Sequence, residues 1–337
     1  MLGEALVEKG YQITVLGNRF AGDLFATPFQ EAFGTAVIRC FDTGFCQEYR
    51  QFDLDKMKQT IVEQRSRILL INYQDYLFPD KQGLNELVDF LVDRGGRAYA
   101  IVHDTCLSSE VCWTQITRIV PPTLASIIPG IEIDQGIPEF FELPEANLVD
   151  FWRIASMGLG RNRLEALLRI TRELNAEGSL ARPIRMIAFV PRTTQQAEYE
   201  EYKKRFSHLT TYPGYHPRYE LASMLHNCNA AAIWYPEITD CANSSAFRFC
   251  IGSKVPIVST KTNWIKDYQT TGTFMSVDAD SEESWKITLR KLFGTESNYS
   301  FYREMISRHQ EAAVQEKGWS QIADQYDRVF QDSPEIP

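Results

Sequence analysis

Glycines and arginines are concentrated at one expected strand-to-helix junction. The segment Ile154–Arg163 reads IASMGLGRNR, in which Gly158 and Gly160 are followed by Arg161 and Arg163. Glycine lets the backbone approach a ligand closely, and the free amides at a helix N-terminus attract anions. A guanidinium adds fixed positive charge that matches phosphate oxygens. The pattern predicts a phosphate-binding loop, and a tight turn with solvated arginines is the structural alternative.

A second concentration of polar groups lies between an expected strand and the helix that follows it. Asn243 or Ser244 can cap this helix, and Ser244 and Ser245 offer hydroxyls and amides to an anion. Glu237 and Asp240 could accept hydrogen bonds from hydroxyl groups such as those of a sugar. Ligands of open α/β sheets bind at the carboxyl ends of strands. The segment therefore predicts a ligand site, and a capped helix with surface acids is the alternative.

Isolated residues at three other expected strand ends could also contact a ligand. His103 ends one strand and could face a ligand, or it could be a half-buried structural histidine. Tyr215 or His216 could stack on a base, unless their segment is only a rigid turn. Arg192 follows a further strand and suits a 2′-phosphate. An NADP-dependent enzyme thus remains an alternative, although the Gly-x-Gly pattern lacks its third glycine.

Helical and strand patterns alternate along the chain, which predicts an α/β protein with two doubly wound parallel sheets. Strands are expected at 11–16, 36–41, 68–72, 98–103, 151–157, 185–190, 209–212, 230–235 and 256–259. Helices are expected at 2–9, 54–66, 84–94, 163–174, 197–206, 219–226, 244–251, 281–292, 299–316 and 320–331, and 119–137 is expected to combine strand and loop.

The first half of the sequence departs from the usual opening of a doubly wound domain. Such a domain opens with its central strand, whereas this sequence opens within a helix that Gly10 closes. An omitted central strand leaves neighbouring strand edges unpaired, which is costly inside a sheet. We therefore expect either a shielded edge at strand 11–16, or a gap filled by a partner chain or by 119–137.

Composition excludes several classes of protein. The chain has 337 residues, a formal net charge of −9 and a pI of about 5.2, which argues against a general nucleic-acid binder. Its seven cysteines include no CxxC pair, so we expect no structural zinc site and reduced thiols in a cytoplasmic protein. No apolar run has the roughly 18 residues that a membrane span needs.

The order of these motifs resembles the GT-B glycosyltransferases, especially the retaining group called family 4. The likeness covers most of the chain and is more specific after residue 150. The matching features are Gly160-Arg161 in a phosphate loop, Gly214-Tyr215 before Glu220-Leu221-Ala222, the strand end Tyr235-Pro236, Gly252–Val258 after the donor helix, His103 at a strand end, and the helix 319–330.

The resemblance implies two Rossmann-like domains facing a cleft. It places an acceptor-side domain at 1–145, a donor-binding domain at 146–318 and a helix that crosses back at 319–337. The implied activity is metal-independent transfer of a sugar from a UDP- or GDP-sugar to a glycan or lipid-linked acceptor. It requires no cofactor besides the donor, and peripheral contact with the inner face of a membrane would fit a lipid-linked acceptor.

The resemblance also assigns roles to individual residues. Arg161, Arg163 and the helix after Ser244 would neutralise the diphosphate, and His103 would contact the sugar ring. Glu237 or Asp240 would hold the sugar hydroxyls. The sequence departs from the family at the second glutamate of its paired motif, whose position holds a phenylalanine, Phe247. A non-catalytic GT-B module that recognises a glycan or supports a partner transferase is therefore the second hypothesis.

Overall fold

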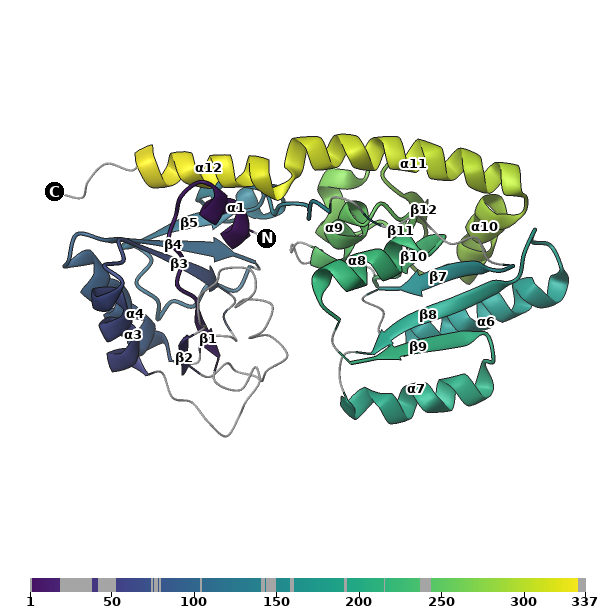
Figure 1. The fold of residues 1–337 in the computed structure, drawn as a ribbon, viewed down its shortest axis with the longest axis horizontal. Helices are drawn as coiled ribbons and strands as arrows, with labels where there is room; N and C mark the ends of the chain where they lie inside the picture. The colour runs from purple at the N-terminus through teal and green to yellow at the C-terminus, as the bar shows by residue number, and fades with distance from the viewer. Residues whose placement is uncertain are drawn as a thin grey trace. The chain divides into compact units, whose positions relative to one another are not determined.

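The chain divides into two compact units (Figure 1). Unit 1 comprises residues 1–135, 240–243 and 319–337, and unit 2 comprises 136–239 and 244–318. The computed structural model describes residues 2–18, 38–41, 53–73, 75, 78, 80–103, 105–140, 143, 150–157, 161–190, 193–214, 216–236 and 244–332, without the side chains of 17, 18, 39, 41, 161 and 193–196. The domain limits expected from the sequence stay a prediction.

Unit 2 is built on a six-stranded sheet in which every strand pairs in parallel with its neighbours. The strands are β7 (Trp152–Ser156), β8 (Ile184–Val190), β9 (Leu209–Pro213), β10 (Ala230–Ile233), β11 (Ile257–Thr260) and β12 (Met275–Val277). Their order is β12-β11-β10-β7-β8-β9. Chain order therefore reverses direction between β7 and β10, as in a doubly wound sheet.

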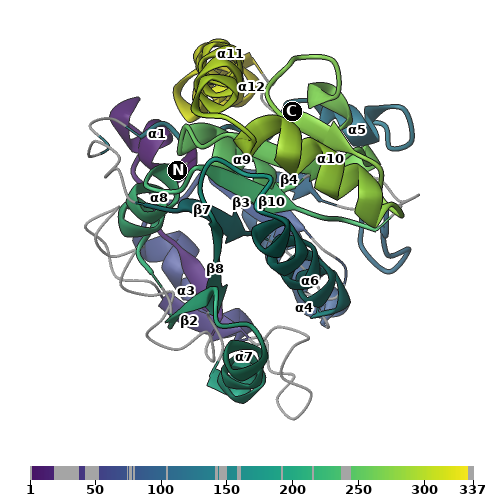
Figure 2. The same cartoon turned by 90° about the vertical axis from the view of Figure 1, so that its right-hand side faces the viewer.

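Helices cover both faces of this sheet (Figure 2). One face packs on α6 (Arg161–Glu177), α7 (Thr193–Arg205) and α10 (Glu282–Phe293), and the other on α8 (Arg218–His226), α9 (Ser245–Gly252) and the 3₁₀ helix η2 (Asn263–Tyr268). The long helix α11 (Glu296–Lys317) contributes Tyr299 to the first layer and Val314 to the second. Because both faces are covered, the sheet contains strands that are buried throughout, for example the apolar Ala-Ala-Ala-Ile of β10.

The described residues of unit 1 form two smaller parallel sheets. The strands β3 (Ile68–Tyr73), β4 (Arg97–Val102), β5 (Ile116–Val120) and β6 (Ile131–Glu132) form one sheet in that order, and β1 (Leu16–Asn18) pairs with β2 (Ile38–Phe41) in the other. The helices are α1 (Leu2–Glu8), α3 (Leu54–Glu63), α4 (Lys81–Val92), α5 (Pro122–Ala125) and α12 (Trp319–Asp332).

The last helix of the chain is part of the core of unit 1. Helix α12 packs on α1 and on the four-stranded sheet through buried apolar side chains. The Tyr11 hydroxyl donates to Asp327 Oδ1 at 2.6 Å, and Lys9 forms an ion pair with Asp324. Burial and the Asp327 carboxylate raise the pKa of Tyr11 to about 12, so its phenol stays protonated as a donor.

Side-chain caps explain where several helices begin. Asp80 accepts a hydrogen bond from the Gly83 amide at 2.8 Å at the start of α4. Ser281 and Thr295 cap α10 and α11 in the same way, at 3.0 Å each. Each cap satisfies one of the amides that have no partner within the first helical turn.

Most of the expected elements are present, and most of the corrections concern the first half. Residues 2–8 are helical as predicted, with Gly10 at φ +92° after the helix. The strand expected at 11–16 is wrong over most of its length, because the ladder begins only at Leu16. The segment 119–137 forms β5, α5 and β6, and β6 pairs with β5, so it does not lie between β1 and β3. The elements that the sequence did not predict are α5, η2 and β12.

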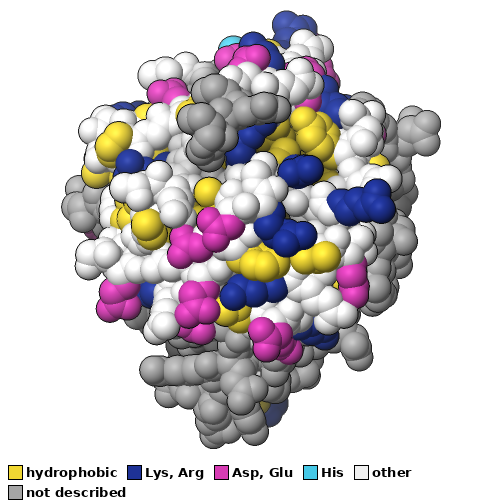
Figure 3. Space-filling view, turned by 90° about the vertical axis from the view of Figure 1, so that its left-hand side faces the viewer, with side chains coloured by type: hydrophobic (Ala, Val, Ile, Leu, Met, Phe, Trp, Pro, Cys, Tyr) yellow, Lys and Arg dark blue, Asp and Glu magenta, His cyan; other side chains and the backbone are white. Residues whose placement is uncertain are grey.

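Surface charge of both signs is interspersed on the face drawn in Figure 3. Basic, acidic and hydrophobic side chains alternate on that face, without a broad area of one colour. None of the helices in the described ranges combines the length and apolar composition needed to cross a membrane.

Candidate functional site

The centre of the unit 2 sheet is a topological switch point. The adjacent strands β7 and β10 pair in parallel through Ala230–Ile154, Ala231–Ala155 and Ala232–Ser156. Helix α6 follows β7 on one face of the sheet, and α9 follows β10 on the other. Two helices on opposite faces therefore begin after adjacent central strands, at the carboxyl edge of the sheet, which is where open α/β sheets bind ligands.

The expected phosphate loop leads into α6. This helix begins at Arg161, which confirms that the glycine-arginine segment lies at a strand-to-helix junction. Gly158 and Gly160 lie outside the described residues, as does the side chain of Arg161. Their contact with a phosphate stays a prediction. The position of Arg161 at the first residue of α6 places its backbone amide among those without a helical partner.

Arg163 is held by contacts within unit 2. Its Nη1 donates to the Ala279 carbonyl at 2.9 Å, and its Nη2 lies 3.5 Å from Asp280 Oδ1. The guanidinium also lies over the Trp234 ring, with Cζ 5.3 Å from the centroid. A hollow of about 340 Å³ opens beside these groups. It is lined by Asn162, Arg163, Ala166, Arg169, Trp234, Asp280 and Glu282.

The start of α9 is organised around Ser244. Its hydroxyl accepts a hydrogen bond from the Phe247 amide at 3.0 Å and pairs with the Tyr235 hydroxyl at 2.8 Å. The Ser244 amide donates to the Trp264 carbonyl at 3.2 Å. The helix-capping role predicted for Ser244 is confirmed, and its buried hydroxyl is engaged within the protein. Ser245, the first residue of α9, is exposed.

The other candidates between residues 192 and 240 are only partly described. Glu237, Asp240, Arg192 and Tyr215 lie outside the described residues, so their roles stay predictions. His216 is described: its Nδ1 lies 3.1 Å from Glu220 Oε1 at the start of α8. The histidine ring lies near two aromatic rings at the ends of β8 and β9. Its centroid is 6.1 Å from that of Phe189 and 6.3 Å from that of Tyr212.

His103 lies at the carboxyl edge of the unit 1 sheet, directly after β4. It is half-buried, and its amide donates to the Tyr73 carbonyl at the end of β3 at 3.3 Å. Its Nε2 lies 3.4 Å from Asn72 Oδ1. Burial lowers the pKa of His103 below its usual value, so the ring is neutral at pH 7.

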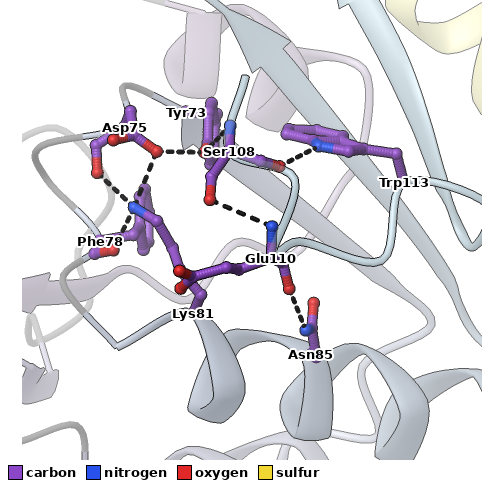
Figure 4. A network of polar contacts seen from close by, with 8 residues as sticks. All are labelled: Tyr73, Asp75, Phe78, Lys81, Asn85, Ser108, Glu110 and Trp113. Carbon is purple, nitrogen blue, oxygen red and sulfur yellow. Dashed lines mark hydrogen bonds and ion pairs between the residues drawn. The ribbon is translucent and has the colours of Figure 1, made fainter. Parts of the chain in front are cut away.

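A polar network fixes the loops beside His103 (Figure 4). The ammonium group of the buried Lys81 pairs with Asp75 Oδ1 at 2.9 Å and donates to the carbonyls of Asp75 and Phe78. The Tyr73 hydroxyl donates to Asp75 at 2.9 Å and accepts from the Ser108 amide at 3.3 Å. Burial opposes ionisation of Asp75, but the bonds from Lys81 and Tyr73 outweigh it and lower its pKa.

Comparisons with known proteins show which fold this arrangement has. No protein-family model matches the sequence, and it has no match among curated proteins. HepE from Anabaena, solved with UDP-glucose, matches with a TM-score of 0.66 and 12% identity over 98% of this chain and 96% of HepE. A glycosyltransferase from Rickettsia africae matches with a TM-score of 0.67 and 6% identity over 98% of this chain and 92% of its own. The chain has the GT-B fold.

A third GT-B structure matches over a smaller share of its length. The pneumococcal O-GlcNAc transferase GtfA, solved with UDP and GlcNAc, has a TM-score of 0.55 and 8% identity over 86% of this chain and 62% of GtfA. The GT-B fold, with parallel sheets in both units, confirms the fold class predicted from the sequence.

In this GT-B chain, sequence reasoning missed the residues that hold Arg163. Trp234, Ala279 and Asp280 come from segments far from Arg163 in the sequence. A backbone carbonyl such as that of Ala279 leaves no signal in residue type. Only Trp234 could have pointed to these contacts, because it lies at a strand end next to Tyr235.

Proposed function

We propose that this protein transfers a sugar from a nucleoside-diphosphate donor to an acceptor. The observation that carries the proposal is the switch point of unit 2, where the N-termini of α6 and α9 flank adjacent central strands. Helix N-termini with unpartnered amides stabilise phosphate groups. The HepE and GtfA structures, solved with UDP-glucose and with UDP and GlcNAc, support a UDP-sugar as the first donor to test.

In this proposal the main catalytic task is stabilisation of the leaving nucleoside diphosphate. The loop with Gly158 and Gly160 lets the backbone approach the diphosphate, and Arg161 neutralises it together with the Ser245 amide. Arg163 is the second proposed cation. Its Asp280 partner has a side chain that is 74% exposed, so a phosphate can replace this ion pair at little cost.

The remaining proposed contacts concern the sugar and the base. Glu237 or Asp240 would accept hydrogen bonds from the sugar hydroxyls, and the neutral His103 would contact the sugar ring. Tyr215, beside His216, would stack on the base, and Arg192 would add positive charge near the nucleotide. Metal-independent transfer to a glycan or lipid-linked acceptor, in the cytoplasm or at the inner face of a membrane, completes the proposal.

One observation favours a second candidate function, a non-catalytic GT-B module. The position of the family's second glutamate holds Phe247, which is fully buried against Tyr268 and Phe274. An apolar ring in the core cannot hold a ribose or sugar hydroxyl. A module of this kind would bind a glycan or a partner transferase without turning over a donor.

Nucleotide binding and donor hydrolysis separate the two candidates. The protein is first screened by thermal shift against UDP, GDP, ADP and their sugars, and the best ligand is then titrated by calorimetry. Stabilisation by one nucleoside diphosphate together with slow hydrolysis of its sugar is expected. Binding without any hydrolysis or transfer supports the module, and the absence of binding to every nucleotide contradicts the glycosyltransferase.

A further inference from the structure

Helices α6 and α10 lie side by side in unit 2 (Figure 2), and ion pairs join them. The pairs are Arg169–Glu282, Glu173–Lys286 and Glu177–Arg290, with N–O distances of 2.8, 2.5 and 2.7 Å. Successive members are four residues apart on each helix, so each helical turn contributes one pair. We refer to these three pairs as the ladder.

The ladder does not continue to the N-terminal ends of the two helices. One turn earlier it would pair residue 165 with residue 278, but both are acidic, and Glu165 pairs with α7 instead. The next ion pair, from Arg163 Nη2 to Asp280 Oδ1, is 3.5 Å long and exceeds the ordinary hydrogen-bond range. The hollow described above opens in this interval, where the α6 surface carries the small side chain of Ala166.

Several polar groups that line the hollow retain hydrogen-bonding capacity. Glu282 uses Oε1 for Arg169, whereas its Oε2 has no partner among the described residues. The Asn162 amide and the Asp280 carboxylate likewise form no hydrogen bond within the described parts of the chain. The hollow is thus lined by acceptor oxygens on the α10 side, and by amide and guanidinium donors on the α6 side.

The charges of the lining indicate which class of ligand suits the hollow. Arg163 and Arg169 are offset by Asp280 and Glu282, so the lining has no net charge. An anion would meet the two carboxylates and a cation the two guanidiniums, and each repulsion offsets the matching attraction. A neutral ligand that both donates and accepts hydrogen bonds avoids this conflict, and hydroxyl groups do both.

The size and surface of the hollow narrow the ligand further. Its volume of about 340 Å³ is near the lower limit of small-molecule sites, which span roughly 300–1,000 Å³. Trp234 is only 2% exposed and the Arg163 guanidinium lies over its ring, so the hollow offers no aromatic face to a flat apolar ligand. Most of the lining side chains are polar, which disfavours a mainly apolar molecule. These features together fit a small polyhydroxyl molecule.

We propose that the hollow binds one sugar unit of a neutral saccharide. In this arrangement Asp280 and Glu282 accept hydrogen bonds from sugar hydroxyls, and Asn162 and Arg169 donate to them. The site differs from the donor site of the proposed function, because it lies between α6 and α10, whereas the donor is proposed to bind at the N-termini of α6 and α9. The ligand is therefore a free sugar or a glycan, and a glycan-binding module would use the site equally well.

Titration of the isotope-labelled protein with neutral saccharides gives the first test. Methyl α-glucoside, methyl β-galactoside, N-acetylglucosamine and lactose are added separately, without nucleotide. At least one should cause saturable NMR shifts of the Asn162 side-chain amide and the Trp234 indole N–H, with a dissociation constant on the order of millimolar. The absence of saturation with all four saccharides would overturn the proposal.

Two neighbouring acids on α10 provide a matched pair of variants. Glu282→Ala removes a lining carboxylate and should weaken binding of the best saccharide about tenfold or more. Glu283→Ala is the control, because Glu283 does not line the hollow and its carboxylate lies 3.7 Å from Arg290. The control should bind the saccharide as the native protein does. Equal affinities of the two variants would contradict the proposal.

Filling the hollow tests its shape independently of its charges. Ala166→Leu places a larger side chain in the hollow and should abolish saccharide binding. A melting curve shows whether the variant is folded, and the Glu282→Ala result decides if it is not. Native saccharide affinity in a folded Ala166→Leu variant would exclude the hollow as the site.

UDP distinguishes this site from the donor site. Arg169→Ala should weaken saccharide binding about tenfold or more and leave UDP binding unchanged, since Arg169 is not among the proposed donor contacts. Saturating UDP should leave the saccharide bound to the native protein, and its displacement would assign the hollow to the donor and overturn the proposal. A protein that binds the saccharide but no nucleotide would contradict the proposed function and support this inference.

Discussion

Arg163 and Trp234 donate hydrogen bonds to the same carbonyl oxygen, that of Ala279, at 2.9 and 2.7 Å. The guanidinium lies over the indole, and the indole stacks on Trp285 of α10 with centroids 4.8 Å apart. One backbone oxygen thereby ties together the first turn of α6, the end of β10 and the loop before α10. The first turn of α6, which follows the proposed phosphate loop, is thereby fixed from the side of α10.

Replacing Arg163 by alanine should destabilise unit 2 by about 1–3 kcal/mol, because the Ala279 carbonyl loses a charged donor. Asp280→Ala is the matched control. It removes only an exposed ion pair and should cost less than about 1 kcal/mol. Urea unfolding of both variants measures the difference, and equal costs would show that the bond to Ala279 contributes nothing.

Replacing Arg161 by alanine should weaken UDP binding about tenfold or more, while uridine binding changes little. The expected loss reflects the position of Arg161 at the first residue of α6. Arg169→Ala is the control, since Arg169 lies on the same helix and pairs with Glu282 at 2.8 Å. Calorimetry with both ligands checks this prediction, and equal losses for UDP and uridine would exclude a phosphate contact.

The fold could be predicted where local patterns determine it. Helices such as α10 combine an apolar face with a capping serine, and their limits agree with the sequence reading within a few residues. A strand was predicted at 11–16 because its apolar pattern is typical of strands. A strand also needs an adjacent strand to which its backbone can form hydrogen bonds. Pairing with β2 begins only at Leu16, and no pattern within the stretch itself signals this.

The candidate site shows the same division between local and long-range signals. The junction at Arg161 and the cap at Ser244 could be predicted because they depend on residues that are close together in the sequence. The link between Arg163 and Ala279 was not found, because it joins residues 116 positions apart through a backbone carbonyl. Residue types alone do not indicate such a contact.

Replacing His103 by alanine should lower the turnover of the true donor and leave UDP affinity nearly unchanged. The reason is that His103 belongs to unit 1, whereas the diphosphate is proposed to bind at the switch point of unit 2. Paired measurements of kcat and of UDP binding by calorimetry check it. Normal turnover in the variant would reduce His103 to a structural residue.

The stability of the protein should fall as the pH drops below about 6.5. Burial lowers the pKa of His208, whose Nε2 lies 2.9 Å from the buried Thr171 hydroxyl, and burial also lowers the pKa of His103 and His226. As the pH falls, these histidines therefore bind protons in the unfolded chain before they do so in the folded protein. Their contribution to the free energy of unfolding is complete above about pH 6.5 and is lost as the pH falls toward their pKa values in the folded protein.

A His208→Gln variant isolates one of these groups. Glutamine can still reach the Thr171 hydroxyl but does not titrate. The variant should lose less stability between pH 7 and pH 5 than the native protein, by at most about 1.4 kcal/mol per pH unit. Urea unfolding at several pH values checks this, and parallel pH profiles for the two proteins would show that His208 is not responsible.

Breaking the buried ion pair between Arg248 and Asp267 should lower the free energy of unfolding strongly, whereas replacing both residues by apolar ones should lower it little. Its Nη2–Oδ2 distance is 2.9 Å, and Lys317 approaches the same Oδ2 at 3.4 Å, so α9, η2 and the end of α11 meet at one carboxylate. Because Arg248 is only 1% exposed, Asp267→Asn leaves its charge poorly compensated and should cost about 3–5 kcal/mol. The double variant Arg248→Met/Asp267→Leu should recover most of that loss, since two apolar side chains need no compensation. Urea unfolding of Arg248→Met, Asp267→Leu and the double variant gives the coupling energy, and additive losses would mean that the two residues stabilise the protein independently.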